Sequence, residues 1–306
     1  MTSLSRDLRS SVIMAAKRAT GRPQHDAQSA IKLGTCIIRF DSPKVMGIVN
    51  NTPDSFSGDG LDGNVDLAVE RGRAIFEEGG DIVDVGGEST RPGAEPVSLD
   101  LELARVVPVV ERLSALRPGR VSVDTMKPRV ADAALFAGAS IVNDVSGLRN
   151  DEMIRVVAEH DSAVIIMHML GEPRDMQTKP RYKDVVSDIK AYLSERVSTA
   201  EAGGVDPKKI MVDPGIGFGK TLEHNLEILA NLREFKSLGK PLVIGVSRKA
   251  FIGKLTGRPA DQRLAGSIAA AVLAVREGAN IVRVHDVKET VDAIRTSNAV
   301  MSFALE

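Results

Sequence analysis

An eightfold alternation of short apolar runs and amphipathic stretches constrains the fold of this chain more than any other feature. The apolar runs are rich in Val and Ile and are short enough to be strands. The stretches between them repeat their apolar residues with the 3.6-residue period of a helix. We expect strands at residues 45–49, 82–85, 121–124, 140–142, 163–167, 210–212, 242–245 and 281–284. We expect helices at about 65–79, 99–116, 127–138, 150–160, 184–203, 222–234, 261–277 and 286–300.

The order of these elements favours a parallel sheet. Several expected helices end in glycine immediately before the next strand, as at Gly80, Gly138, Gly204 and Gly278, which is a signal for a helix C-terminus. Strands that are apolar on both faces are typical of parallel sheets covered by helices. Eight strand–helix pairs therefore predict an α/β fold, a closed (β/α)8 TIM barrel. The pattern alone also allows an open, doubly wound sheet.

A polar segment precedes the first of these strands. Residues 1–30 predict a loosely ordered extension with a short helix around 6–18, and residues 31–43 predict a small hairpin. We therefore divide the chain into an N-terminal extension, 1–43, and one barrel domain, 44–306. The total of 306 residues is close to the size of one barrel plus an extension.

The composition indicates a globular protein and excludes several classes of site. Hydrophobic residues make up 43% of the chain and charged residues 26%. The formal net charge of −1 predicts no general attraction to nucleic acid or to a membrane surface. Cys36 is the only cysteine, which excludes intrachain disulfides and a cysteine-built metal site. The absence of a membrane-spanning apolar run and of a signal-peptide core predicts a cytoplasmic protein.

Polar and charged side chains stand at the carboxyl end of most expected strands. They include Asp124, Asn143, His168, Asp213, the run Ser247-Arg248-Lys249, Arg283 and His285. In a parallel barrel these strand ends meet at one rim, so the side chains are expected to surround a polar ligand. Each has a structural alternative when taken alone: Asp124 can cap a helix, Asn143 can close a turn, and His168 can be a packed, hydrogen-bonded histidine.

The chemistry of these groups predicts a flat heterocycle bearing a diphosphate. Two aspartates can accept hydrogen bonds from an amino-amidine edge, and Asn143 can meet a lactam edge. The cations Arg91, Lys249, Arg283 and His285 can hold a diphosphate and stabilise it as a leaving group. The long polar loop that begins at Asn50 offers oxygen ligands for a hard cation such as Mg²⁺.

The segment Asp213-Pro-Gly-Ile-Gly-Phe-Gly-Lys220 resembles nucleotide-binding motifs only superficially. A P-loop requires glycine where this chain has Pro214, and the dinucleotide fingerprint lacks its third glycine. The spacing of His, Cys and Asp matches no zinc site, and no Gly-x-Ser-x-Gly nucleophile elbow is present.

Long, ordered motifs from about residue 45 to 299 identify a family. They are Met46-Gly-Ile-Val-Asn50, Asp84-Val-Gly-Gly-Glu-Ser-Thr-Arg-Pro-Gly93, Ser122-Val-Asp124, Asn143-Asp-Val-Ser-Gly147, Met167-His168-Met169, Asp213–Lys220, Ser247-Arg-Lys249, Arg263-Leu-Ala-Gly-Ser267 and Arg283-Val-His-Asp286. In these motifs the chain resembles the dihydropteroate synthase family, which has the pterin-binding TIM-barrel fold. The resemblance implies condensation of 6-hydroxymethyl-7,8-dihydropterin diphosphate with p-aminobenzoate, with release of pyrophosphate, for folate synthesis.

The resemblance also implies a role for each matching residue. The pterin would be held by Asp124, Asn143, Asp213, Lys249 and Arg283. The diphosphate would be held by Asn50, Thr90, Arg91, Arg283 and His285, with Mg²⁺ beside Asn50. The p-aminobenzoate pocket would be formed by Phe56, Thr90, Pro92, Phe218 and Ser247. Catalytic roles would belong to Asp124, Lys249, Arg283 and His285, through dissociative loss of pyrophosphate followed by attack of the arylamine. The family also implies a homodimer formed through helices late in the barrel.

Three positions depart from the family pattern. Asn51 stands where a small apolar residue is usual, and the first-loop aspartate, Asp59, is displaced by one position. Ala250 follows Lys249 where a serine is often found. Two alternatives to the synthase are a pterin-binding methyltransferase, which shares the barrel, and a catalytically silent homologue that binds a pterin. The methyltransferase has no need of the Ser-Arg-Lys and Arg-Val-His motifs, and only the displaced aspartate supports the silent homologue.

Overall fold

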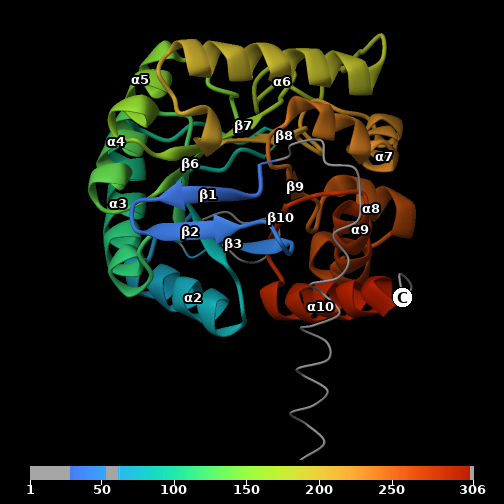
Figure 1. The fold of residues 1–306 in the computed structure, drawn as a ribbon, viewed down its shortest axis with the longest axis horizontal. Coiled ribbons are helices and arrows are strands. Elements are labelled where there is room, and N and C mark those ends of the chain that lie inside the picture. Colours follow the sequence, from blue (N-terminus) through green and yellow to red (C-terminus); the bar gives the residue numbers. More distant parts are fainter. Residues whose placement is uncertain (1–27, 53–60, 62, 92, 304–306) are drawn as a thin grey trace, which may run out of the picture.

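The computed structural model describes residues 28–52, 61, 63–91 and 93–303, and Figure 1 shows its fold. The helix expected around residues 6–18 lies outside the described residues, as do the predicted site residues Phe56 and Pro92.

Eight parallel strands form the centre of the molecule. They are β3 (Lys44–Asn50), β4 (Ile82–Gly86), β5 (Val121–Asp124), β6 (Ile141–Asp144), β7 (Ala163–Met167), β8 (Ile210–Asp213), β9 (Val243–Gly245) and β10 (Ile281–Val284). Their order in the sheet is β8-β7-β6-β5-β4-β3-β10-β9. A parallel bridge between Val212 of β8 and Leu242, next to β9, joins the two edges. The sheet therefore closes into the predicted barrel, and the open alternative is excluded.

The helices follow the strands and form a layer around the barrel (Figure 1). They are α2 (Val65–Glu77), α3 (Leu99–Leu116), α4 (Pro128–Phe136), α5 (Asp151–Glu159), α6 (Val185–Ala202), α7 (Leu222–Ala230), α8 (Ala250–Thr256), α9 (Leu264–Arg276) and α10 (Val287–Phe303). Short 3-10 helices lie at η1 (Pro207–Lys209), η2 (Leu232–Leu238) and η3 (Ala260–Gln262). Apolar side chains of the helices pack on those of the strands in one large core. No helix in the described ranges combines the length and apolar character needed to cross a membrane.

The helices between β8 and β10 differ from the predicted boundaries. The expected helix at 222–234 is interrupted at Asn231, whose side-chain amide donates a 2.8 Å hydrogen bond to the carbonyl of Glu227. Such bonds compete with the regular helix, and the chain continues as the 3-10 helix η2. The short helix α8 was not predicted, because seven residues reveal little of a helical period. It ends at Thr256 and is followed by Gly257, which has the positive φ of 70° that glycine tolerates.

The predicted hairpin is present and closes one end of the barrel. Strands β1 (Ala30–Leu33) and β2 (Cys36–Arg39) pair antiparallel. Their side chains Ile31, Leu33 and Ile38 are buried against residues that open the barrel strands, including Ile82 and Ile281. The hairpin therefore covers the amino end of the barrel, across which Figure 1 shows it lying. A ligand can therefore enter only from the opposite end of the barrel, where the strands end in polar residues.

Candidate active site

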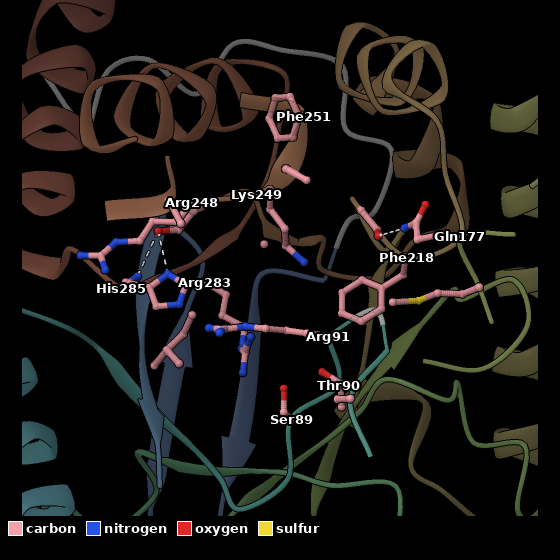
Figure 2. Close-up of a pocket in the computed structure, with 18 of the residues that line it drawn as sticks. Ser89, Thr90, Arg91, Gln177, Phe218, Arg248, Lys249, Phe251, Arg283 and His285 are labelled. Atoms are coloured by element: carbon pink, nitrogen blue, oxygen red, sulfur yellow. Dashed lines mark hydrogen bonds between the residues drawn. The ribbon is translucent and has the colours of Figure 1, made fainter. Parts of the chain in front are cut away.

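A cavity of about 940 Å³ opens at the carboxyl end of the barrel. Predicted site residues that line it are Asn50, Thr90, Arg91, Asp124, Phe218, Ser247, Lys249, Arg283 and His285. Figure 2 shows many of them pointing into the same space from different strand ends. Asn143 and Asp213 are buried, with 4% and 6% of their surface exposed, and they are not among the lining residues. The barrel thus gathers polar groups from distant parts of the sequence into one cavity.

Arg283 lies at the centre of the polar groups. Its Nε donates a 2.6 Å hydrogen bond to Asp84, and its Nη2 donates a 2.6 Å hydrogen bond to Asp124. Burial opposes the charged form of Arg283, but the two carboxylates outweigh it and raise the pKa of the guanidinium. Arg283 therefore remains a cation, fixed in orientation by two strands of the barrel.

Asp84 was not predicted to belong to the site. It is fully buried within β4, where its carboxylate accepts hydrogen bonds from Arg283 and from the side-chain amide of Asn143 at 3.0 Å. The available signal was a charged residue inside an otherwise apolar strand, because such residues are seldom buried without a partner. Asp84 thus orients two of the predicted pterin-binding side chains.

Asp124 ends strand β5 and lines the cavity. In the strand register it lies between Gly86 of β4 and Asn143 of β6. Its Oδ2 is bound to Arg283, whereas Oδ1 is buried and has no hydrogen-bond partner among the described residues. Burial raises the pKa of the Asp124 carboxyl to about 7, although Arg283 opposes this shift. A buried acceptor without a partner is costly, so a ligand with N–H donors is the natural complement to this oxygen.

Asp213 ends β8 and begins the glycine-rich loop. Its Oδ1 accepts a 2.7 Å hydrogen bond from the backbone N–H of Gly215. Gly215 has φ 71°, and a Cβ there would lie 1.9 Å from the carbonyl oxygen of His168, so only glycine fits. Burial raises the pKa of Asp213 to about 6, while the hydrogen bond from Gly215 opposes the shift. The Asp-Pro-Gly motif therefore has a packing reason as well as a chemical one.

Phe218 and Lys249 both line the cavity, and their side chains lie next to each other (Figure 2). The Lys249 Nζ lies 4.1 Å from the centroid of the Phe218 ring, which is the geometry of a cation–π contact. Burial and the nearby charge of Arg283 lower the pKa of Lys249 to about 8. The Phe218 ring packs beside a cluster rich in methionine, which includes Met167, Met169 and Met176. The side-chain amide of Gln177 holds the same loop by donating a 2.6 Å hydrogen bond to Gly217.

Ser247 and His285 are joined by hydrogen bonds at the end of β10. The Ser247 hydroxyl accepts the backbone N–H of His285 at 3.2 Å and lies 3.0 Å from its Nδ1. The His285 carbonyl accepts a 2.8 Å hydrogen bond from Arg71. The next residue, Asp286, forms an ion pair with Arg248 at 2.5 Å. These contacts fix the His285 ring beside the cations Arg91 and Arg283 in Figure 2.

His168 is a packed histidine, as the structural alternative predicted. It is 5% exposed, its Nδ1 lies 3.0 Å from the Lys220 Nζ, and its ring meets Tyr192 edge-on. Burial, aided by Lys220, lowers the pKa of His168 to about 2, so the ring is neutral. Lys220 is itself buried and donates a 2.9 Å hydrogen bond to the Phe218 carbonyl. The pair supports the Phe218 loop from behind.

Helix α3 anchors the roots of the first two loops. Arg105 donates a 3.0 Å hydrogen bond to the carbonyl of Gly87, and its own carbonyl accepts a 2.9 Å bond from Asn51. One turn earlier, the fully buried Glu102 pairs with Lys127, which also pairs with Glu88. These contacts were not predicted. Asn51, where the family usually has a small apolar residue, thus has a defined partner on α3.

The described side chains offer few ligands for the expected Mg²⁺. No group of three or more His, Cys, Asp or Glu in the part of the chain described here could hold a metal ion. Asn50 lines the same cavity as Arg91 and His285, and Asp59 lies outside the described residues. Mg²⁺ commonly binds through one or two protein oxygens together with phosphate oxygens, so the amide oxygen of Asn50 fits an ion that is bound together with a diphosphate.

Known proteins are similar to this chain in sequence and in fold. The family described as pterin binding enzyme matches residues 46–285. The dihydropteroate synthase of Escherichia coli is 45% identical over 260 residues, which cover 85% of this chain and 92% of that protein. The Yersinia pestis dihydropteroate synthase, solved with a sulfonamide drug complex, has a TM-score of 0.87 and 42% identity, covering 89% of this chain and 99% of that chain. The Xanthomonas albilineans dihydropteroate synthase, solved in complex with 7,8-dihydropteroate, has a TM-score of 0.79 and 44% identity, covering 89% of this chain and 98% of that chain. This chain belongs to the dihydropteroate synthase family of pterin-binding enzymes.

Proposed function

We propose that this transferase condenses 6-hydroxymethyl-7,8-dihydropterin diphosphate with p-aminobenzoate to give 7,8-dihydropteroate and pyrophosphate. The observation that carries the proposal is the buried Asp124 carboxylate, which is held by Arg283 through one oxygen while the other is without a partner among the described residues. A dihydropterin ring has the N–H donors that this oxygen lacks. The E. coli, Y. pestis and X. albilineans relatives are dihydropteroate synthases, and the X. albilineans protein was solved with the expected product.

The buried end of the cavity suits the pterin. In the proposed complex Asp124 and Asp213 accept hydrogen bonds from the ring, Asn143 meets its amide edge, and Lys249 and Arg283 complete the contacts. Asp84 supports this arrangement because it orients both Asn143 and Arg283. Asp124 then acts by electrostatics, because its negative charge stabilises the positive charge that develops on the pterin as the C–O bond breaks.

The cationic side of the cavity suits the diphosphate. Arg91, Arg283 and His285 stand together there, with Thr90 and Asn50 also lining the cavity. These residues hold the leaving pyrophosphate and offset its charge. Mg²⁺, when bound with the diphosphate beside Asn50, would supply further neutralisation of that charge.

The Phe218 side of the cavity suits p-aminobenzoate. The ring of Phe218 offers an aromatic surface, and Thr90 and Ser247 line the same cavity. Phe56 and Pro92, which complete the proposed pocket, lie outside the described residues. The arylamine nitrogen attacks the exocyclic methylene of the pterin once the C–O bond has broken, so a C–N bond forms and the amine loses a proton.

The deciding experiment mixes the two substrates with the protein and Mg²⁺ while pyrophosphate release is followed in a coupled assay. Mass spectrometry of the product should show 7,8-dihydropteroate. Binding of the pterin without pyrophosphate release would instead favour the catalytically silent homologue. Methyl transfer from a reduced folate to a corrinoid protein, without condensation, would favour the methyltransferase.

We also propose a homodimer that uses the outer face of α9. The small-residue run at 265–271 is divided: Ser267, Ala270 and Ala271 are buried, whereas Ala265 and Ala269 are exposed together with Leu264 and Leu273. The inward half packs within the protein, and the outward half leaves apolar surface of the kind that subunits cover. Sedimentation of the wild type and of Leu273→Glu tests this: the wild type should be a dimer and the variant a monomer.

A further inference from the structure

The motif Arg263-Leu-Ala-Gly-Ser267 has no part in the reaction proposed above, yet it holds a turn that does. Arg263 precedes α9, and its guanidinium reaches back to the turn between β9 and α8. Its Nη1 donates to the carbonyl of Arg248 at 3.0 Å and lies 3.3 Å from that of Lys249. Its Nε donates a 3.0 Å hydrogen bond to the carbonyl of Arg258. One side chain thus binds three backbone carbonyls around α8.

Ser267 holds the same turn from the other side. Its hydroxyl accepts a 2.8 Å hydrogen bond from the backbone N–H of Arg248 and donates one of 2.8 Å to the carbonyl of Arg263. Both the N–H and the C=O of Arg248 are therefore bound by side chains of the motif. Ser267 is 5% exposed, so these hydrogen bonds are protected from competition by water.

Arg248 needs such support because its backbone is strained. It has φ 55°, in the left-handed region that residues with a Cβ seldom occupy. This conformation sends neighbouring side chains in different directions: Arg248 pairs with Asp286, whereas Lys249 points towards Phe218 (Figure 2). If the backbone at Arg248 relaxed, the Lys249 amine would move away from the Phe218 ring, because Lys249 directly follows Arg248 in the chain.

The glycine at position 253 leaves room for the clamp. A Cβ added to Gly253 would lie 2.2 Å from Nη2 of Arg263, closer than atoms can approach. The obstructed atom is the end of a flexible side chain, so an alanine there would displace the guanidinium. Gly266 similarly leaves room for Ile252 of α8, with 2.4 Å between an added Cβ and its Cγ2. Helices α8 and α9 therefore pack closely enough for Arg263 to reach the turn.

We propose that Arg263 and Ser267 are positioning residues, which hold the Ser247–Lys249 turn in its strained conformation and so place the Lys249 amine in the cavity. The catalytic consequence of this placement rests on the proposed function. The placement itself is a property of the free protein and can be measured without substrate.

The first test measures the reactivity of Lys249 in substrate-free protein. Trace labelling with acetic anhydride at pH 8, read by peptide mass spectrometry, is applied to the wild type, Arg263→Gln, Ser267→Ala and the exposed control Arg258→Gln. Burial keeps the pKa of Lys249 near 8, so release of the turn into water should raise it and lower labelling about tenfold in the first two variants. Arg258→Gln should label as the wild type does. Unchanged labelling in Arg263→Gln and Ser267→Ala would overturn the proposal, whichever reaction the protein catalyses.

The second test uses Gly253→Ala, which helix propensity alone predicts to stabilise α8. Displacement of Arg263 should instead lower kcat about tenfold with a smaller change in the KM for p-aminobenzoate. In an Arg263→Ala background the same substitution should have no further effect, because its target is absent. Additive losses in the double variant would contradict the clamp. A rise in the p-aminobenzoate KM alone, with normal labelling of Lys249, would show that Arg263 contacts that substrate directly and would also refute positioning. If Arg263→Ala fails to fold, Ser267→Ala and Gly253→Ala still decide the matter.

Discussion

Arg283 and Asp124 are 159 positions apart in the sequence, yet their charged groups share a 2.6 Å hydrogen bond at the carboxyl end of the barrel. Asp84 binds the same guanidinium, so three strands fix one cation between two carboxylates. The other oxygen of Asp124 is buried and has no hydrogen-bond partner among the described residues. The Arg283 side chain thereby joins the proposed pterin contacts to the proposed diphosphate contacts.

Asp124→Asn is expected to lower kcat by about 10²–10³-fold, equivalent to roughly 3–4 kcal/mol, because a neutral amide cannot stabilise a cationic pterin. Pyrophosphate release under saturating substrates measures the loss. Asp292→Asn, an exposed change on α10, is the matched control and should leave kcat unchanged. An Asp124→Asn enzyme with near-normal turnover would remove Asp124 from the mechanism.

The pH profile of kcat/KM for the pterin diphosphate should be bell-shaped. Asp124 must be ionised, and since burial raises its pKa to about 7, activity should fall as the pH decreases through that value. Lys249 must be protonated, and since burial lowers its pKa to about 8, activity should fall again as the pH increases through 8. Lys249→Arg should lose the alkaline fall, because arginine stays charged. Ionisation of the substrate is the same for both proteins and cancels in the comparison. An alkaline limb that is identical in Lys249→Arg would contradict the assignment.

Phe218→Leu is expected to raise the KM for p-aminobenzoate about 5–30-fold, because the leucine loses the aromatic surface and the contact with Lys249. The KM for the pterin diphosphate should change less. Phe136→Leu is a suitable control, since Phe136 is 90% exposed on the far side of α4 from the core. Steady-state kinetics with each substrate varied in turn measures both constants; equal changes in the two KM values would argue against a p-aminobenzoate pocket at Phe218.

Removal of divalent cations with EDTA should abolish condensation, and Mg²⁺ should restore it. Asn50→Ala should raise the Mg²⁺ concentration needed for half-maximal activity by about tenfold, since it removes the proposed protein oxygen ligand. A titration of activity against Mg²⁺ in both proteins makes the measurement. Full activity in EDTA would show that the cationic residues of the cavity suffice for the diphosphate.

Sulfonamides are expected to compete with p-aminobenzoate. The chain is 42% identical in sequence to the Y. pestis synthase that was solved with a sulfonamide drug complex. Inhibition at several fixed p-aminobenzoate concentrations should give lines that intersect at a common maximal rate. Undiminished activity at the solubility limit of the drug, or a pattern independent of p-aminobenzoate, would contradict a shared pocket.

The repeated pattern of the sequence was sufficient to predict the eight strand–helix pairs, whereas the closure of the sheet into a barrel was seen only in the structure, in the bridge between Val212 and Leu242. The positions of the strands and helices depend on local periodicity and on glycines at helix ends, and both of these signals are visible in the sequence. The hairpin and seven of the helix positions follow from the same signals. This approach failed for short elements. Helix α8 has too few residues to reveal its period, and the break at Asn231 depends on one side-chain hydrogen bond.

The sequence by itself determined which strand ends carry polar residues, and so it predicted Asp124, Arg283 and His285 for one rim. Only the tertiary structure decided how those groups pair. It bound Asp84 to Arg283, placed His168 against Lys220, and brought Arg263 to the carbonyl of Arg248. The physical reason is that strand periodicity is a local property of the chain, whereas a hydrogen bond between residues far apart requires the closed barrel to bring them together.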